Sequence, residues 1–217
     1  MIDPGTVTPS SGALTFFNDD EARTVEAFAE RIIPDDGTGT GARAAGVVYY
    51  IDRAVSGFST KLQPLYRLGL KELELFCRQL LGAAFQDLGA DQQDDVVRRL
   101  VGPETGSVGG LQFSQDDQGH EASAPAGAAL DLALLQRLAA VIREHTVEGF
   151  FGDPAYGGNR DTVGWKLVGF PGAHWGYTAA QMGRGFDGRS IPIKTLADLR
   201  AELRNLPDNS TFNLNEE

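Results

Sequence analysis

The sequence has little cysteine, few histidines and a deficit of positive charge. Its 217 residues include one cysteine, three histidines and 19 basic against 30 acidic side chains, which gives a net charge of −11. The single cysteine, Cys77, excludes an internal disulfide, a cysteine-held iron–sulfur cluster and a cysteine-type zinc site. It lies in an apolar helical pattern, so we interpret it as an inert buried thiol. The acidic balance argues against nucleic acid, whose phosphates need a basic surface, and against an anionic membrane.

Long apolar runs and export signals are also missing. No window approaches the roughly 20 apolar residues that span a bilayer, so we expect no direct membrane insertion. The N-terminal stretch MIDPGTVTPSSGALTFF has no basic start, no long apolar run and no twin arginine. The chain as written is therefore expected in the cytoplasm. It would be periplasmic or membrane-associated if a signal was removed or is carried by a partner, and both interpretations stay open.

Apolar residues recur instead at helical spacing. The spacing predicts an all-α fold, an irregular helical bundle with a long glycine- and aromatic-rich C-terminal coil. We expect helices at 19–33, 47–55, 62–85, 90–100, 128–148 and 195–205, the first capped by Asn18 and ended by Pro34. A flexible segment, 1–15, should precede a single domain over 16–206 and a polar tail over 207–217. Within the domain, 102–127 is predicted to be a loop and 149–193 a wrapping segment.

The segment after the helix expected at 128–148, the strongest helical pattern in the sequence, breaks the periodic pattern. It reads EGFFGDPAYGGNRDTVGWKLVGFPG, and residues 149–188 contain 11 of the 27 glycines and both tryptophans. Large aromatic side chains on glycine-rich backbone suit intermolecular contact, so we predict a partner surface. A coil that buries its own aromatics is the alternative. Asn159 is expected to cap a short helix. The predicted contact residues are Phe150, Phe151, Tyr156, Asn159, Arg160, Trp165, Phe170, His174, Trp175 and Tyr177.

The same segment resembles the signature of the gluconate 2-dehydrogenase subunit 3 family. Upstream, FAERIIPDDGTGTGARAAGVVYYID resembles the family's helix, acidic turn and Ile-Asp element, so the resemblance covers about 14–172. It implies a helical, cofactor-free chain bound to a large FAD-dependent dehydrogenase subunit of the glucose–methanol–choline type. That partner would oxidise a sugar or sugar acid and pass the electrons to a cytochrome or other acceptor. Many family members carry a twin-arginine signal and escort their partner across the membrane, and this sequence shows no such signal.

The residues themselves contain no flavin-binding turn. A Gly-x-Gly-x-x-Gly turn between a strand and a helix would be needed. The glycines of DDGTGTGARAAG follow a predicted helix instead. We therefore expect that stretch to be a loop and the FAD to belong to another chain, with no cofactor or metal in this one.

Few residues are arranged for chemistry. His145 and Glu148 share one helix face, the spacing of an acid–base pair or of half a metal site. We favour a buried, hydrogen-bonded histidine and expect no catalytic residue. The alternative is a free-standing small enzyme that uses His145, Glu148 and Asp153 for acid–base chemistry on a sugar-like substrate. A third possibility is an assembly chaperone that leaves the mature complex. Asp52, near Arg53, is expected to form a salt bridge or a cap.

Overall fold

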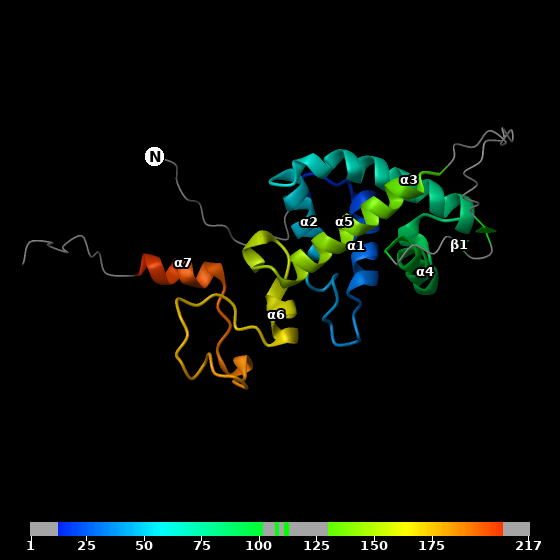
Figure 1. Ribbon diagram of the computed structural model, residues 1–217. Helices are drawn as coiled ribbons and strands as arrows, with labels where there is room; N and C mark the ends of the chain where they lie inside the picture. The colour runs from blue at the N-terminus through cyan, green and yellow to red at the C-terminus, as the bar shows by residue number, and fades with distance from the viewer. Residues whose placement is uncertain (1–12, 102–106, 109–110, 113–129, 206–217) are drawn as a thin grey trace, which may run out of the picture.

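The computed structural model describes residues 13–101, 107–108, 111–112 and 130–205. Within these ranges the fold is all-α, as predicted, with one short antiparallel pair of strands (Figure 1). Three predicted segments lie wholly or mostly outside the described residues: the whole of the polar tail, most of the flexible segment over 1–15, and most of the loop over 102–127. The helices are α1 (Asp19–Ile32), α2 (Val47–Ser56), α3 (Gln63–Leu81), α4 (Ala90–Val101), α5 (Leu132–Phe151), α6 (Val163–Val168) and α7 (Leu196–Arg204), and the strands are β1 (Ser107–Val108) and β2 (Leu111–Gln112). Five short 3₁₀ turns join them, namely η1 (Thr60–Leu62), η2 (Phe85–Asp87), η3 (Pro154–Tyr156), η4 (Arg160–Thr162) and η5 (Gly188–Ser190).

Helix α5 runs through the middle of the bundle and packs against α1, α2, α3 and α4 (Figure 1). Because neighbours surround it, apolar residues cover much of its circumference. Leu135, Leu138 and Ile142 are fully buried, whereas Leu134 is only partly covered. The helix starts later than the predicted 128–148, at the residue after Asp131, whose carboxylate accepts the N–H of Leu134 at 2.9 Å. No helix in the described ranges is both long and apolar enough to cross a membrane.

Two helix ends show how local signals set the boundaries. In α1 the side chain of Asn18 accepts the N–H of Glu21 at 2.9 Å, and the Glu21 carboxylate accepts the N–H of Asn18 at 3.0 Å. This capping box confirms the predicted start. The third helix was predicted to reach residue 85 but ends at Leu81. Gly82 follows in the left-handed region (φ +80°), the conformation that commonly terminates a helix, and its N–H donates to the carbonyl of Arg78.

A buried carboxylate attaches the segment before α1 to α2. Asp52 is only 2% exposed and accepts the backbone N–H groups of Thr15, Phe16 and Phe17 at 2.7, 2.9 and 2.9 Å. The expected cap therefore exists, but it caps a distant segment, and the expected salt bridge is absent from the ion pairs among the described residues. Phe17 is buried, and its amide requires such an acceptor.

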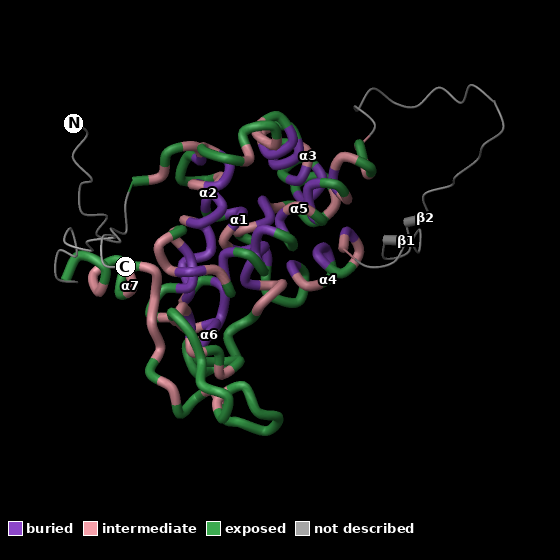
Figure 2. The backbone as a smooth tube through the Cα atoms, turned by 60° about the vertical axis from the view of Figure 1, so that its left-hand side comes forward, coloured by how far each residue is buried: buried purple, intermediate pink, exposed green. Residues whose placement is uncertain are grey.

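The chain leaves the helical body after α6. We call residues 173–205 the arm, which contains η5 and α7 and extends beyond the bundle (Figure 1). None of its residues is buried, in contrast to the helices of the body (Figure 2). The start of the arm meets Lys194 at a neck, where Gly172 bridges Lys194 and the N–H of Ala173 donates to the carbonyl of Lys194 at 2.7 Å. The N–H of Leu196 donates to the carboxylate of Asp153 at 2.8 Å.

Candidate functional site

The unusual segment identified in the sequence packs its backbone directly against the last turns of α5. A Cβ atom placed on Gly158 would lie 2.1 Å from the carbonyl oxygen of Gly149. One placed on Gly164 would lie 2.0 Å from the carbonyl oxygen of Phe150. Side-chain carbons do not approach carbonyl oxygens so closely, so both positions need glycine for contact with α5.

Asn159 joins the two sides of this turn. Its side chain is fully buried; Oδ1 accepts the N–H of Gly164 at 2.8 Å and Nδ2 donates to the carbonyl of Gly152 at 2.8 Å. Asn159 was expected at the cap of a short helix, but α6 begins only at Val163, with Thr162 at the cap position. Asn159 instead accepts the N–H of Gly164 from a position outside the helix. Its own φ is +45°, and two neighbours, Asp161 at +54° and Thr162 at +55°, share this sparsely populated region. Strained turns of this kind concentrate at functional sites.

Three of the ten predicted contact residues are core residues instead. Phe150 and Asn159 are completely buried and Trp165 is 4% exposed. The Trp165 indole N–H donates to the carbonyl of Phe151 at 2.7 Å, which anchors α6 to the end of α5. These side chains face inward because a glycine-rich turn lets the backbone come close enough for its aromatics to fill the bundle. In this fold the three side chains are therefore not accessible to a partner.

The other seven lie at the surface. Phe151, Tyr156, Arg160, Phe170, Trp175 and Tyr177 are exposed and His174 is half-buried. The Trp175 ring is 64% exposed, yet its N–H donates to Glu202 of α7 at 2.9 Å, so the ring has a fixed position. Further large apolar side chains are exposed on α6, just after it and in the arm. We call the following set the apolar arm surface: Leu167, Val168, Phe170, Trp175, Tyr177, Met182, Phe186 and Leu203.

His145 lies in a buried cluster with two tyrosines. Its Nδ1 is 2.9 Å from the hydroxyl of Tyr66, and the two rings stack at 12° with centroids 5.9 Å apart. Burial lowers the pKa of His145, although the carboxylates of Glu148 and Glu144 act in the opposite direction. The Tyr50 hydroxyl donates to Glu148 at 2.8 Å. Burial and then this carboxylate raise the pKa of Tyr50. The favoured interpretation, a buried and hydrogen-bonded histidine, describes this geometry.

The trio of the alternative enzyme hypothesis is only partly assembled. His145 and Glu148 are electrostatically coupled, but Asp153 has other partners. One of its carboxylate oxygens accepts the N–H of Ala155 at 2.9 Å and the other that of Leu196 at 2.8 Å. Sequence reasoning missed Tyr50 and Tyr66, although a buried tyrosine on an apolar helix face signals that its hydroxyl needs a partner.

A shallow cavity of about 470 Å³ opens beside this cluster. We call it the aromatic groove. Residues of α2, α5 and η3, with Phe58 just after α2, form its walls, and Glu148 is the one charged residue among those that line it. The lining residues are Tyr50, Phe58, Val147, Glu148, Phe151, Gly152 and Tyr156.

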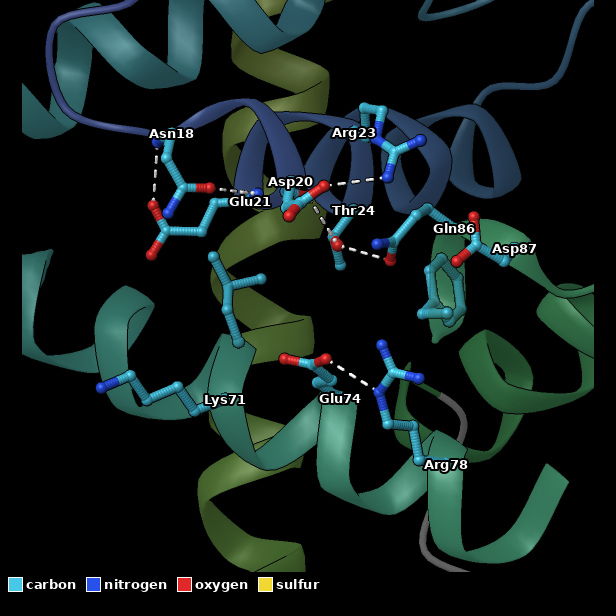
Figure 3. A pocket seen from close by; sticks show the side chains of 12 residues that line it. Asn18, Asp20, Glu21, Arg23, Thr24, Lys71, Glu74, Arg78, Gln86 and Asp87 are labelled. Atoms are coloured by element: carbon cyan, nitrogen blue, oxygen red, sulfur yellow. Dashed lines mark hydrogen bonds and ion pairs between the residues drawn. The ribbon is translucent and has the colours of Figure 1, made fainter. Parts of the chain in front are cut away.

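A second cavity, of about 320 Å³, is polar and lies between α1 and α3. Figure 3 shows the side chains of α1 facing Lys71, Glu74 and Arg78 of α3 across an open space. Much of its charge is neutralised locally, since Arg23 pairs with Asp20 and Arg78 with Glu74, each at 2.9 Å. None of the predicted site residues lines it.

The glycine loop after α1 has its amides occupied. Asp35 accepts the N–H groups of Gly39, Gly37 and Thr40, which hold the pKa of its carboxyl below the ordinary value. A helix precedes this loop, as predicted. Amides bound to a carboxylate are not free to hold a phosphate group. Among the described residues, no three His, Cys, Asp or Glu side chains converge as metal ligands.

Residues 19–172 match the family described as gluconate 2-dehydrogenase subunit 3, from the first residue of α1 to the neck of the arm. The chain belongs to this family. The match confirms the resemblance found in the sequence, and the family's description is that of a subunit of a dehydrogenase. No curated protein and no solved structure matches the chain.

The span that matches the family ends at the residue before the arm begins. The glycines that pack on α5, the buried Asn159 and Trp165, and the histidine cluster all lie inside the matched span. The subunit 3 match ends at Gly172, so the arm lies outside it. The helical body therefore lies within the matched span, and the arm follows it in the chain.

Proposed function

We propose that this chain is a non-catalytic small subunit that binds and stabilises the catalytic subunit of a sugar or sugar-acid dehydrogenase. The proposed partner is FAD-dependent and of the glucose–methanol–choline type, and it passes electrons to a cytochrome or other acceptor. Membership of the subunit 3 family supports the accessory role. The apolar arm surface is the observation that carries the proposal of binding.

The arm gains little from its own packing. None of its residues is buried, yet it displays Trp175, Met182 and Phe186 to solvent. Exposed apolar side chains that gather into one patch mark interaction sites, and aromatic side chains dominate the anchors of such sites. The hydrogen bond from Trp175 to Glu202 holds one anchor in place, which lowers the entropy lost on binding.

The competing enzyme hypothesis has weaker support. His145 is buried and its Nδ1 is engaged by Tyr66, while both oxygens of Asp153 accept backbone amides. The cavity next to them is mostly apolar with one carboxylate. A sugar-like substrate needs several converging polar groups, because each of its hydroxyls must replace bonds to water.

Co-expression with a catalytic subunit encoded beside this chain tests the proposal. We expect a stable stoichiometric complex, and faster thermal inactivation of the dehydrogenase when the small subunit is omitted. Trp175→Ala should weaken the complex, whereas Leu75→Ala, an exposed leucine on α3, serves as the matched control. A catalytic subunit that is equally soluble, active and thermostable alone, with no complex formed, would refute the proposal. A complex seen during assembly but absent from the active enzyme would identify a chaperone instead.

A further inference from the structure

The aromatic groove contains a carboxylate that has no counter-ion. Glu148 is exposed, accepts one hydrogen bond from Tyr50 at 2.8 Å, and forms no ion pair with any other described residue. The lining residues around it are a valine, a glycine and four aromatic residues. The carboxylate is exposed and unpaired among the described residues, so a cation from another molecule can reach it.

The rings around Glu148 favour the same kind of ligand. Phe58 and Tyr156 are 73% and 53% exposed, and Phe151 is 38% exposed, so part of each ring is open to solvent. The face of an aromatic ring attracts cations, and it does so more strongly when water is excluded. A flat guanidinium can stack on rings and donate two hydrogen bonds to one carboxylate. Carboxylate and rings together therefore recognise a guanidinium better than a neutral or anionic group.

We propose that the aromatic groove binds an arginine side chain presented by the catalytic partner subunit. This inference rests on the proposed function and names the chemistry of one contact in it. Phe151 and Tyr156 line the groove and also belong to the predicted contact set. A sugar acid is disfavoured as the occupant, because its carboxylate would face Glu148 in a chain of net charge −11.

Arg53, which lies beside η3, does not fill this role. Arg53 packs on the backbone of Gly157, where an added Cβ would lie 2.9 Å from Arg53 Cδ and 3.1 Å from a terminal nitrogen. It makes no ion pair with Glu148. The cation must therefore come from another molecule.

A charge-removing substitution with a matched control tests the inference in the co-expressed complex. Glu148→Gln keeps an oxygen that can accept from Tyr50, and Glu144→Gln removes an exposed carboxylate on the same helix that does not line the groove. We expect Glu148→Gln to raise the dissociation constant about ten-fold or more at low salt, and less at high salt. Glu144→Gln should change it less than about two-fold. Unchanged unfolding midpoints of both variants would show that the fold is intact.

The outcomes separate the two proposals. Equal affinity of Glu148→Gln and Glu144→Gln for a partner that binds the wild type overturns the arginine contact and leaves the subunit role standing. Absence of any complex with the wild type overturns both.

A photo-crosslinker at Phe58 provides a second test by identifying the partner segment that lies over the groove. Replacement of an arginine in that segment by methionine should lose affinity non-additively with Glu148→Gln. A crosslinked segment without arginine, or additive losses, would overturn the inference.

Discussion

Replacement of Gly164 by alanine should destabilise the fold far more than its small size suggests. The added Cβ would lie 2.0 Å from the Phe150 carbonyl oxygen and 2.9 Å from a carbon of the Phe150 ring. Ordinary contact begins near 3.4 Å, whereas the Cβ would lie only 2.0 Å from the oxygen. To reach ordinary contact, α6 and the end of α5 must separate by about 1.4 Å, the difference between 3.4 and 2.0 Å. That movement stretches the 2.8 Å hydrogen bond from the Gly164 N–H to the buried Asn159 side chain.

Two energies contribute to the expected loss. Overpacking of a close contact costs about 1–3 kcal/mol. A buried hydrogen bond that is broken without replacement costs about 1–3 kcal/mol more. Because part of the strain relaxes, we expect the free energy of unfolding to fall by about 3 kcal/mol. For a chain of this length that corresponds to a melting temperature lowered by about 6–12 °C.

Urea unfolding followed by tryptophan fluorescence measures this change, since Trp165 is buried on α6. Gly176→Ala is the matched control: nothing lies within 4 Å of a Cβ placed there, and its φ is not in the left-handed range. It should change stability by less than about 1 kcal/mol. If Gly164→Ala unfolds within about 1 kcal/mol of the wild type, the close backbone contact between the signature turn and α5 is wrong.

Two further perturbations address buried polar groups. Asp52→Asn retains the shape of the side chain but cannot accept hydrogen bonds from three amides equally well. The free energy of unfolding measured in urea should therefore fall by about 2–3 kcal/mol. A loss as small as that of the exposed control Asp187→Asn would contradict a stabilising role of the Asp52 carboxylate. Burial lowers the folded-state pKa of His145, so the unfolded chain binds this proton more readily and stability should fall as pH drops below about 6.5. The slope of the urea midpoint with pH should flatten in His145→Gln, and identical slopes in variant and wild type would refute this.

The sequence predicted those helix boundaries that depend on residues close together in the chain. The start of α1 follows from the pair Asn18 and Glu21, which are three residues apart and complete a capping box within one turn. The end of α3 was missed because apolar spacing continues past Gly82. A glycine stops a helix only when the backbone takes the left-handed conformation there.

Contacts between distant residues could not be predicted. Tyr50 and Glu148 are 98 residues apart, and Tyr66 and His145 are 79 apart, so no periodicity connects them. The aromatic segment shows the same limit. Trp165 and Trp175 occur in similar glycine-rich surroundings, yet one is buried and the other is 64% exposed. Only the position of α5, set by packing against four other helices, decides which of them turns inward.

The neck at Gly172 and Lys194 has a consequence for how such a subunit can change. Since the excursion between them starts and ends at one place, its length can alter at small entropic cost, about 0.6 kcal/mol for each doubling. No residue of the arm is buried in the core of the helical body. We therefore expect a graft that replaces residues between 173 and 193 to leave the helical body folded, so the excursion is a place where this subunit can accept new sequence.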